Sequence, residues 1–161
     1  MRDVITLIDT ICDTYDNQSL LPHPDGTTYC NLAVTAVAEA MGCKDFAGKT
    51  ADEIVGFLAT SENWSPVPFE KAQELANQGS LLVGGLDSKT LGQSHGHIVV
   101  IRPGRTVYSG KWSTNLCPRV LNIGAENFLG RAKKGPLTNQ PAGLNEAFQP
   151  LPKIWVWRPS L

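Results

Sequence analysis

Apolar residues in the first part of the chain recur at helical spacing. Ile5, Leu7, Ile8 and Ile11 share one face of a helix, with aspartates between them, so residues 1–16 are predicted to form an amphipathic helix. The same spacing predicts three more helices. Their starts are at Cys30, at the capping box Thr50–Glu53 and at Pro68, and the last of them stops at Gln78–Gly79.

From residue 80 onward the apolar positions come in short runs typical of strands. Residues 87–94 and 124–149 lack a period and are predicted as loops, the second with one short helix near residues 125–129. Because the helices come first and the strands follow, the pattern predicts one α+β domain over residues 1–161, with helices packed on an antiparallel sheet. The predicted strands are Ser80–Gly85, His95–Ile101, Thr106–Ser109, Arg119–Ile123 and Lys153–Trp157.

Charge and length narrow the partners that the chain can have. Its 161 residues include 14 basic and 15 acidic ones, so the net charge is −1 and no long-range field favours nucleic acid or an anionic membrane. No apolar run approaches the roughly 20 residues that cross a bilayer. The amino-terminal helix carries too many aspartates for a signal peptide, and we expect a soluble protein that is exported without a Sec signal.

The four cysteines are Cys12, Cys30, Cys43 and Cys117. None is paired at the two-residue spacing of a zinc or thioredoxin motif, so no metal site is expected. Two interpretations of Cys12 and Cys43 stay open. They form a disulfide if their helices pack together, or they are small buried thiols like Cys117.

Cys30 opens a predicted helix and His97 opens a predicted strand, which is the placement of a thiol nucleophile and its base. Helix amide groups stabilise a thiolate, and a neighbouring imidazolium does so further, so such a thiol has a pKa well below ~8.5. Tyr29 is a candidate substrate neighbour. His95 shares a strand face with His97 and is the alternative base or a substrate contact. The competing interpretation is that Cys30 and His97 are buried core residues.

Several segments, in this order and spacing, resemble the papain-like peptidoglycan amidases, a superfamily that includes CHAP and NlpC-type cell-wall hydrolases. The likeness covers about residues 25–130. The small size, the missing signal peptide and a cysteine near position 30 are most similar to the amidase effectors delivered by type VI secretion. The segments are Thr28–Asn31, Ala51–Val55, Trp64, Glu70–Gly79, Leu81–Leu86 and Gly96–Gly104.

This resemblance implies that the protein cleaves an amide bond in the peptide stem or crosslink of peptidoglycan. Cys30 would attack the carbonyl, His97 would protonate the leaving amine, and no metal or cofactor would be needed. The backbone amide of Cys30 and one donor from the preceding loop would hold the oxyanion. The protein would act as a monomer in the periplasm of a target bacterium, and an immunity protein that occludes the cleft is the implied partner.

In such enzymes a third group orients the imidazole from the next strand. Asn122 shares a face with Val120 and is a polar amide inside an apolar run, so we expect it to take this role. The alternative is that Asn122 makes a turn with Gly124, which would leave Glu126 or Asn127 as the orienting group.

Two other classes of function are compatible with the sequence. A papain-like protease, deamidase or acyltransferase acting on protein would use the same cysteine and histidine with a different groove. A non-enzymatic binding module would have a structural cysteine and histidine that lie far apart. A metal-dependent hydrolase ranks last, because Cys30, His95 and His97 have no supporting carboxylate.

Overall fold

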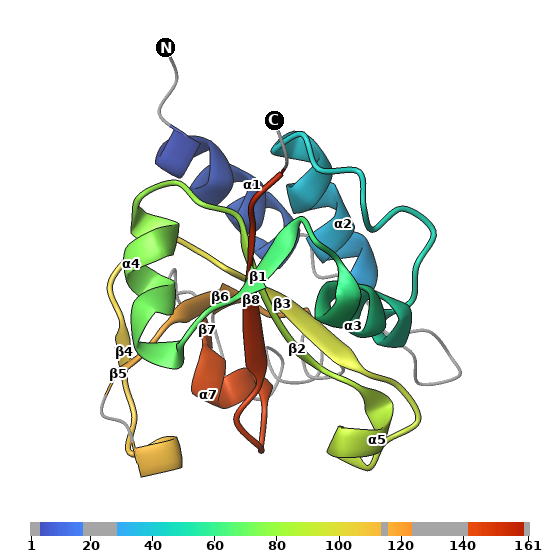
Figure 1. The fold of residues 1–161 in the computed structure, drawn as a ribbon. Coiled ribbons are helices and arrows are strands. Elements are labelled where there is room, and N and C mark those ends of the chain that lie inside the picture. Colours follow the sequence, from blue (N-terminus) through green and yellow to red (C-terminus); the bar gives the residue numbers. More distant parts are fainter. Residues whose placement is uncertain (1–3, 18–28, 114–115, 124–141, 160–161) are drawn as a thin grey trace.

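The computed structural model describes residues 4–17, 29–113, 116–123 and 142–159 of the chain. Within these residues, six strands form one sheet in the order β1–β8–β2–β3–β6–β7, and every neighbouring pair is antiparallel (Figure 1). The last strand of the chain, β8, therefore lies between two earlier ones. The strands are β1 (Trp64–Pro66), β2 (Leu82–Leu86), β3 (His97–Ile101), β6 (Arg119–Leu121), β7 (Ala142–Gly143) and β8 (Lys153–Trp157).

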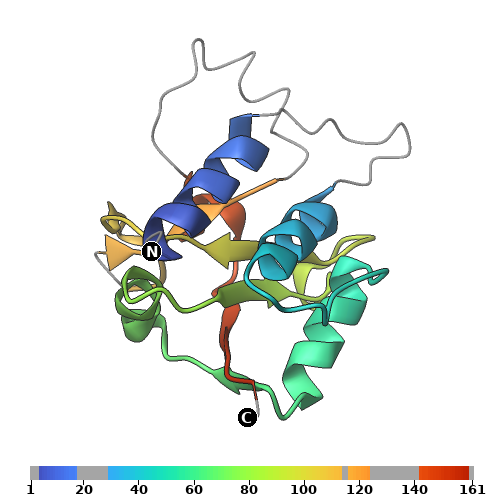
Figure 2. The same ribbon diagram turned by 90° about the horizontal axis from the view of Figure 1, so that it is seen from above.

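Helices cover one face of the sheet, and shorter elements cover the other (Figure 2). The first face carries α1 (Val4–Asn17), α2 (Cys30–Ala40) and α3 (Ala51–Thr60). The second face carries α4 (Ala72–Asn77), α7 (Leu144–Ala147) and the 3₁₀ turns η1 (Phe69–Lys71) and η2 (Lys111–Ser113). A separate hairpin, β4 (Val107–Tyr108) with β5 (Leu116–Cys117), lies beside this second layer. The fold is α+β, as the sequence predicted.

The two central strands are apolar because both of their faces are covered. All of β2 is buried. In β3, Ile98 and Val100 pack under the helices of the first face, whereas Val99 and Ile101 pack into the second layer. Such a strand has a continuous apolar run instead of an alternating one, which is why these two strands could be recognised in the sequence.

The capping box at the start of α3 is confirmed. The Thr50 hydroxyl accepts a hydrogen bond from the Glu53 amide at 3.2 Å, and the Glu53 carboxylate accepts one from the Thr50 amide at 3.1 Å. Two orphan amide groups at the helix start are thereby satisfied by the residues that the sequence pattern named.

Several short elements differ from the sequence prediction. Trp64 begins β1, a strand that was not predicted from the sequence, and pairs with Trp157. The loop expected at residues 87–94 contains α5 (Ser88–Leu91), whose start is capped by the Asp87 carboxylate. The helix α7 also lies in a stretch predicted as loop. Elements of three or four residues are too short to leave a period in the sequence. The short helix expected near 125–129 lies outside the described residues.

All four cysteines are buried thiols in the structure, and none of them forms a disulfide. The structure therefore supports the second interpretation of Cys12 and Cys43, in which both are small buried thiols. Burial is the main cause that raises the pKa of the Cys43 thiol to about 11, and burial also raises the pKa of Cys117. Both side chains are protonated thiols at neutral pH. No helix in the described part of the chain is long and apolar enough to cross a membrane.

An ion pair with a buried arginine fastens α1 to the residue that follows β3. The Arg102 side chain is 1% exposed, and its Nη2 lies 2.6 Å from Asp9 Oδ1. Its Nε donates to the same oxygen at 3.2 Å. Gln73 links the chain at the end of β3 to the start of β6. Its side-chain nitrogen donates to the Arg102 carbonyl, and its side-chain oxygen accepts from the Arg119 backbone amide. The pair thus anchors the amino-terminal helix on the strand that begins at His97.

We expect Asp9→Ala to destabilise the fold more than Arg102→Met does. Asp9→Ala leaves a buried guanidinium without its carboxylate, at a cost of about 3 kcal/mol in the free energy of unfolding. Arg102→Met removes the buried charge, and the Asp9 carboxylate, 48% exposed, remains hydrated. Urea unfolding of both variants measures the difference, and equal losses would contradict the assigned asymmetry.

Candidate functional site

The candidate nucleophile stands at the start of a helix. Cys30 is the first residue of α2, follows the N-cap residue Tyr29, and is 3% exposed. The Tyr29 carbonyl already accepts a hydrogen bond from the Ala33 amide at 3.1 Å. The first amide groups of a helix have no partner within the helix, and they favour negative charge placed beside them. The sulfur of Cys30 is therefore positioned where a thiolate is stabilised.

His97 is the first residue of β3, and a close approach of backbone to side chain fixes where that strand begins. A Cβ atom on Gly96 would lie 2.6 Å from Asp52 Oδ1 and 3.0 Å from the Leu86 carbonyl oxygen. The same Asp52 carboxylate accepts hydrogen bonds from the Ser88 amide at 2.7 Å and from the Ser88 hydroxyl at 2.6 Å. Only glycine fits at position 96, so the chain before His97 is held against α3 and α5.

Asn122 directly follows β6, and the sheet register brings it to His97. Val100 is paired with Leu121, so Asn122 lies across from Val99, on the face that Val99 shares with His97. The distance between His97 Nε2 and Asn122 Oδ1 is 2.6 Å. Because an amide oxygen only accepts hydrogen bonds, Nε2 carries the proton, and Nδ1 is left for Cys30.

His97 and Cys30 are the titratable side chains of the site. Burial by itself would lower the pKa of the His97 imidazole. The hydrogen bond and negative charge of Cys30, together with the hydrogen bond of Asn122, outweigh burial and raise the pKa above its ordinary 6.5. This is the behaviour of an imidazolium that faces a thiolate. The three side chains form a continuous chain from a neutral amide through an imidazole to sulfur, which is the arrangement of an activated thiol.

The other residues singled out from the sequence lie in different places. Tyr29 is half-buried and packs against the core below α2. His95 is exposed and lies in a bend, because β3 begins only at His97. The expectation that His95 and His97 share a strand face is therefore wrong. Glu126 and Asn127, the alternative orienting residues, lie outside the described residues.

One residue of the site was not predicted from the sequence. Phe148 is 3% exposed, and its ring centroid lies 5.2 Å from that of His97 at an interplanar angle of 51°. It follows α7, in the stretch predicted as a loop. No local signal in the sequence identifies it, because the four residues of α7 are too few to leave a helical period.

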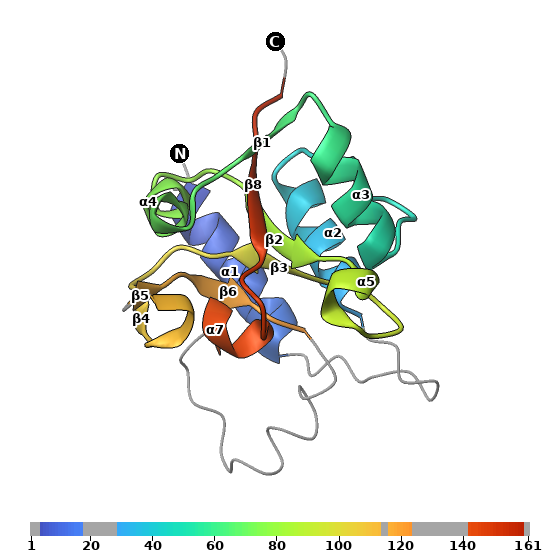
Figure 3. The same ribbon diagram turned by 60° about the horizontal axis from the view of Figure 1, so that its bottom comes forward.

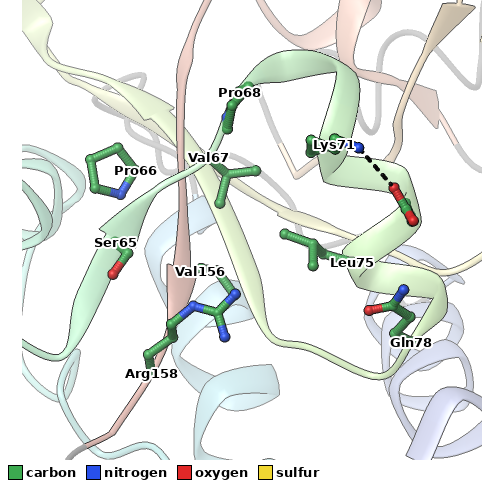
Figure 4. A pocket seen from close by; sticks show the side chains of 10 residues that line it. Ser65, Pro66, Val67, Pro68, Lys71, Leu75, Gln78, Val156 and Arg158 are labelled. Atoms are coloured by element: carbon green, nitrogen blue, oxygen red, sulfur yellow. Dashed lines mark ion pairs between the residues drawn. The ribbon is translucent and has the colours of Figure 1, made fainter.

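A concavity lies between the β1 edge of the sheet and α4. It has a volume of about 330 Å³ and an apolar floor formed by Val67, Leu75 and Val156 (Figure 4). Arg158 reaches into it from the end of β8, and Lys71 pairs with Glu74 at its rim, at 3.6 Å. Neither a thiol nor an imidazole is among its lining residues, so this concavity is separate from the candidate site at Cys30.

The comparisons with known proteins do not add to this description. The sequence matches none of the protein-family models against which it was compared, and no curated protein is similar to it at a significant level. The site is therefore characterised by its own geometry. Among the described residues, no group of three or more His, Cys, Asp or Glu side chains could hold a metal ion.

We expect the pKa of His97 to fall when the sulfur of Cys30 is replaced. In Cys30→Ser the hydroxyl stays neutral, so the charge that raises the His97 pKa is lost and burial then lowers it. An NMR titration of the His97 Cε1 proton, assigned with His97→Gln, measures this pKa in both proteins. An unchanged midpoint would show that no thiolate faces the ring.

We expect Gly96→Ala to disturb the site and Gly56→Ala to leave it intact. The added methyl at position 96 meets the Asp52 carboxylate, which should cost about 1–3 kcal/mol of unfolding free energy and slow the alkylation of Cys30. At Gly56, inside α3, a Cβ meets nothing within 4 Å, and alanine should stabilise the helix by roughly 0.5–1 kcal/mol. Equal behaviour of the two variants would contradict the close approach at Gly96.

Proposed function

We propose that the protein is a cysteine amidase in which Cys30 is the nucleophile, His97 the general acid and base, and Asn122 the residue that orients the imidazole. The observation that carries this proposal is the chain of hydrogen bonds from Asn122 through His97 to Cys30. A structural role for Cys30 and His97 predicts a sulfur and an imidazole that lie far apart. Their hydrogen bond supports the catalytic alternative.

The reaction runs in two halves. In the first, the Cys30 thiolate attacks the carbonyl carbon of a substrate amide, and the backbone amide at the start of α2 binds the developing oxyanion. The His97 imidazolium then gives its proton to the leaving nitrogen, and the C–N bond breaks. The amine leaves, and the acyl group stays on the cysteine as a thioester. In the second half, His97 takes a proton from water, the hydroxide attacks the thioester, and the acid product leaves as the thiolate and imidazolium re-form.

Asn122 acts on this cycle through the ring orientation. Its carbonyl oxygen holds the Nε2 proton of His97, so Nδ1 faces Cys30 in both halves of the reaction. A neutral amide adds no negative charge to the imidazolium, in contrast to an aspartate. The stability of the imidazolium therefore depends mainly on the thiolate.

The substrate that we propose is the peptide part of peptidoglycan. This step rests on the sequence resemblance to papain-like cell-wall amidases, carried by the segments around Cys30 and Gly96–Gly104. The same resemblance supports delivery by type VI secretion into the periplasm of a target bacterium. An immunity protein that occludes the cleft is the partner expected of such an effector. The helical layer bearing the cysteine and the antiparallel sheet bearing the histidine are the arrangement expected of that class.

We expect purified peptidoglycan to be cleaved by the wild-type protein and left intact by Cys30→Ala. His97→Ala should lower the rate by at least about 100-fold, because general acid–base catalysis is lost. Asn122→Ala should lower it by a smaller factor, since the nucleophile stays in place. Mass spectrometry of the released muropeptides identifies the bond that is cut.

Cys43→Ala is the matched control for the nucleophile variant. Cys43 is also buried in the helical layer, but its raised pKa keeps it a thiol, so its removal should leave the cleavage rate unchanged. Absence of muropeptide products, with the Cys30 thiol still selectively alkylated by iodoacetamide, would overturn the peptidoglycan assignment. That outcome would favour a protease or deamidase acting on protein.

A further inference from the structure

Phe148 touches the imidazole of the proposed site from the second layer of the fold. Asn122 fixes one atom of the His97 ring, but the torsion that rotates an imidazole has a broad energy minimum, and a single hydrogen bond leaves it loosely set. The buried ring of Phe148, 5.2 Å away between centroids, packs against His97 at 51°. This packing limits the positions that the imidazole can take and excludes water from that side of it.

The backbone that carries Phe148 is held by a lysine from another element. The Lys111 ammonium donates hydrogen bonds to the carbonyl oxygens of Asn145, at 2.8 Å, and Phe148, at 2.6 Å. These carbonyls lie at the end of α7, beside β6 and β8 (Figure 3). The last carbonyls of a helix have no partner within it, and a lysine is a suitable donor to them. Lys111 therefore fixes the position from which Phe148 projects.

The neighbouring Trp112 holds the backbone of the residue after Phe148. The backbone of Trp112 itself has a strained conformation. Its indole nitrogen donates to the Gln149 carbonyl at 2.7 Å, and its ring is packed edge-on against Phe69. Trp112 has φ 57° and ψ 29°, and it is the one non-glycine residue with positive φ in the described part of the chain. A bulky side chain rarely adopts this left-handed conformation, and such strain gathers at functional sites.

We propose that Phe148 is a positioning residue for His97, and that Lys111 and Trp112 hold it in place. This inference rests on the proposed function, because it assigns His97 the role of the base of Cys30. With Phe148 in place, Nε2 stays on Asn122 and Nδ1 stays directed at the sulfur. A rigid wall of the site is thus supplied by the segment that follows α7, about 50 residues after the histidine in the chain.

The test measures the reaction of Cys30 with iodoacetamide over a range of pH, followed at each cysteine by peptide mass spectrometry. The Cys30 thiolate displaces iodide and becomes a thioether, so the rate reports the thiolate without needing a wall substrate. In Phe148→Leu, an apolar side chain fills the space without a flat ring. We expect the Cys30 rate at about pH 6 to fall on the order of tenfold, and its pH profile to move toward that of an ordinary thiol.

Three controls separate positioning from loss of stability. Phe69→Leu makes the same change in the same apolar cluster at a ring that packs against Trp112, so it should change the Cys30 profile much less than Phe148→Leu does. Phe148→Tyr keeps the ring and should restore the wild-type profile. Labelling of Cys43, which is buried with a pKa of about 11, should increase only if the fold opens. If Phe148→Leu fails to fold, Lys111→Met takes its place, with a smaller fall in rate expected.

A Cys30 rate and profile in the folded Phe148→Leu protein that match the wild type would overturn the positioning role. An equal fall in Phe69→Leu would overturn it as well, since the effect would then be general loosening of the cluster. A wild-type Cys30 that reacts as an ordinary thiol would instead overturn the proposed function itself. The two failures are therefore distinguishable in one experiment.

Discussion

The antiparallel pairing of β3 with β2 on one side and β6 on the other is the constraint on which the site depends. It sets His97 at the start of one strand and brings Asn122, at the end of the next, within 2.6 Å. A shift of either strand by one residue would turn its side chains to the opposite face and separate the two groups. The close fit at Gly96 and the ion pair of Arg102 and Asp9 act at the two ends of β3.

Electrostatics inside the protein distinguish one cysteine from the others. Burial works against every charged form, and it raises the pKa of Cys43 and Cys117. Cys30 is equally buried, yet it lies at a helix start and beside an imidazole whose pKa it raises. A thiolate and an imidazolium each compensate for the desolvation of the other, so the pair can persist where either charge alone would be neutralised.

The two faces of the sheet contribute different parts of the site. Cys30 comes from the helical layer, whereas Phe148 and the Lys111 ammonium that holds its backbone come from the shorter elements on the other side. His97 stands at the end of its strand, where a side chain can meet both layers. Support for the imidazole from one layer leaves the other layer free to present Cys30, the proposed nucleophile. Rigid elements on both sides hold such a site more accurately than loops would.

The sequence by itself determined those elements whose signals lie in residues close together along the chain. The helix that begins at Cys30, the capping box at Thr50, and the buried strands β2, β3 and β8 could all be predicted, because their signals lie within a few residues. The choice of Asn122 as neighbour of His97 combined strand alternation with the orienting group that the family resemblance implies. Only the tertiary structure decided that β1 pairs with β8, that α5 and α7 exist, and that Phe148 packs on His97. These features depend on contacts between residues far apart in the chain, which no local pattern records.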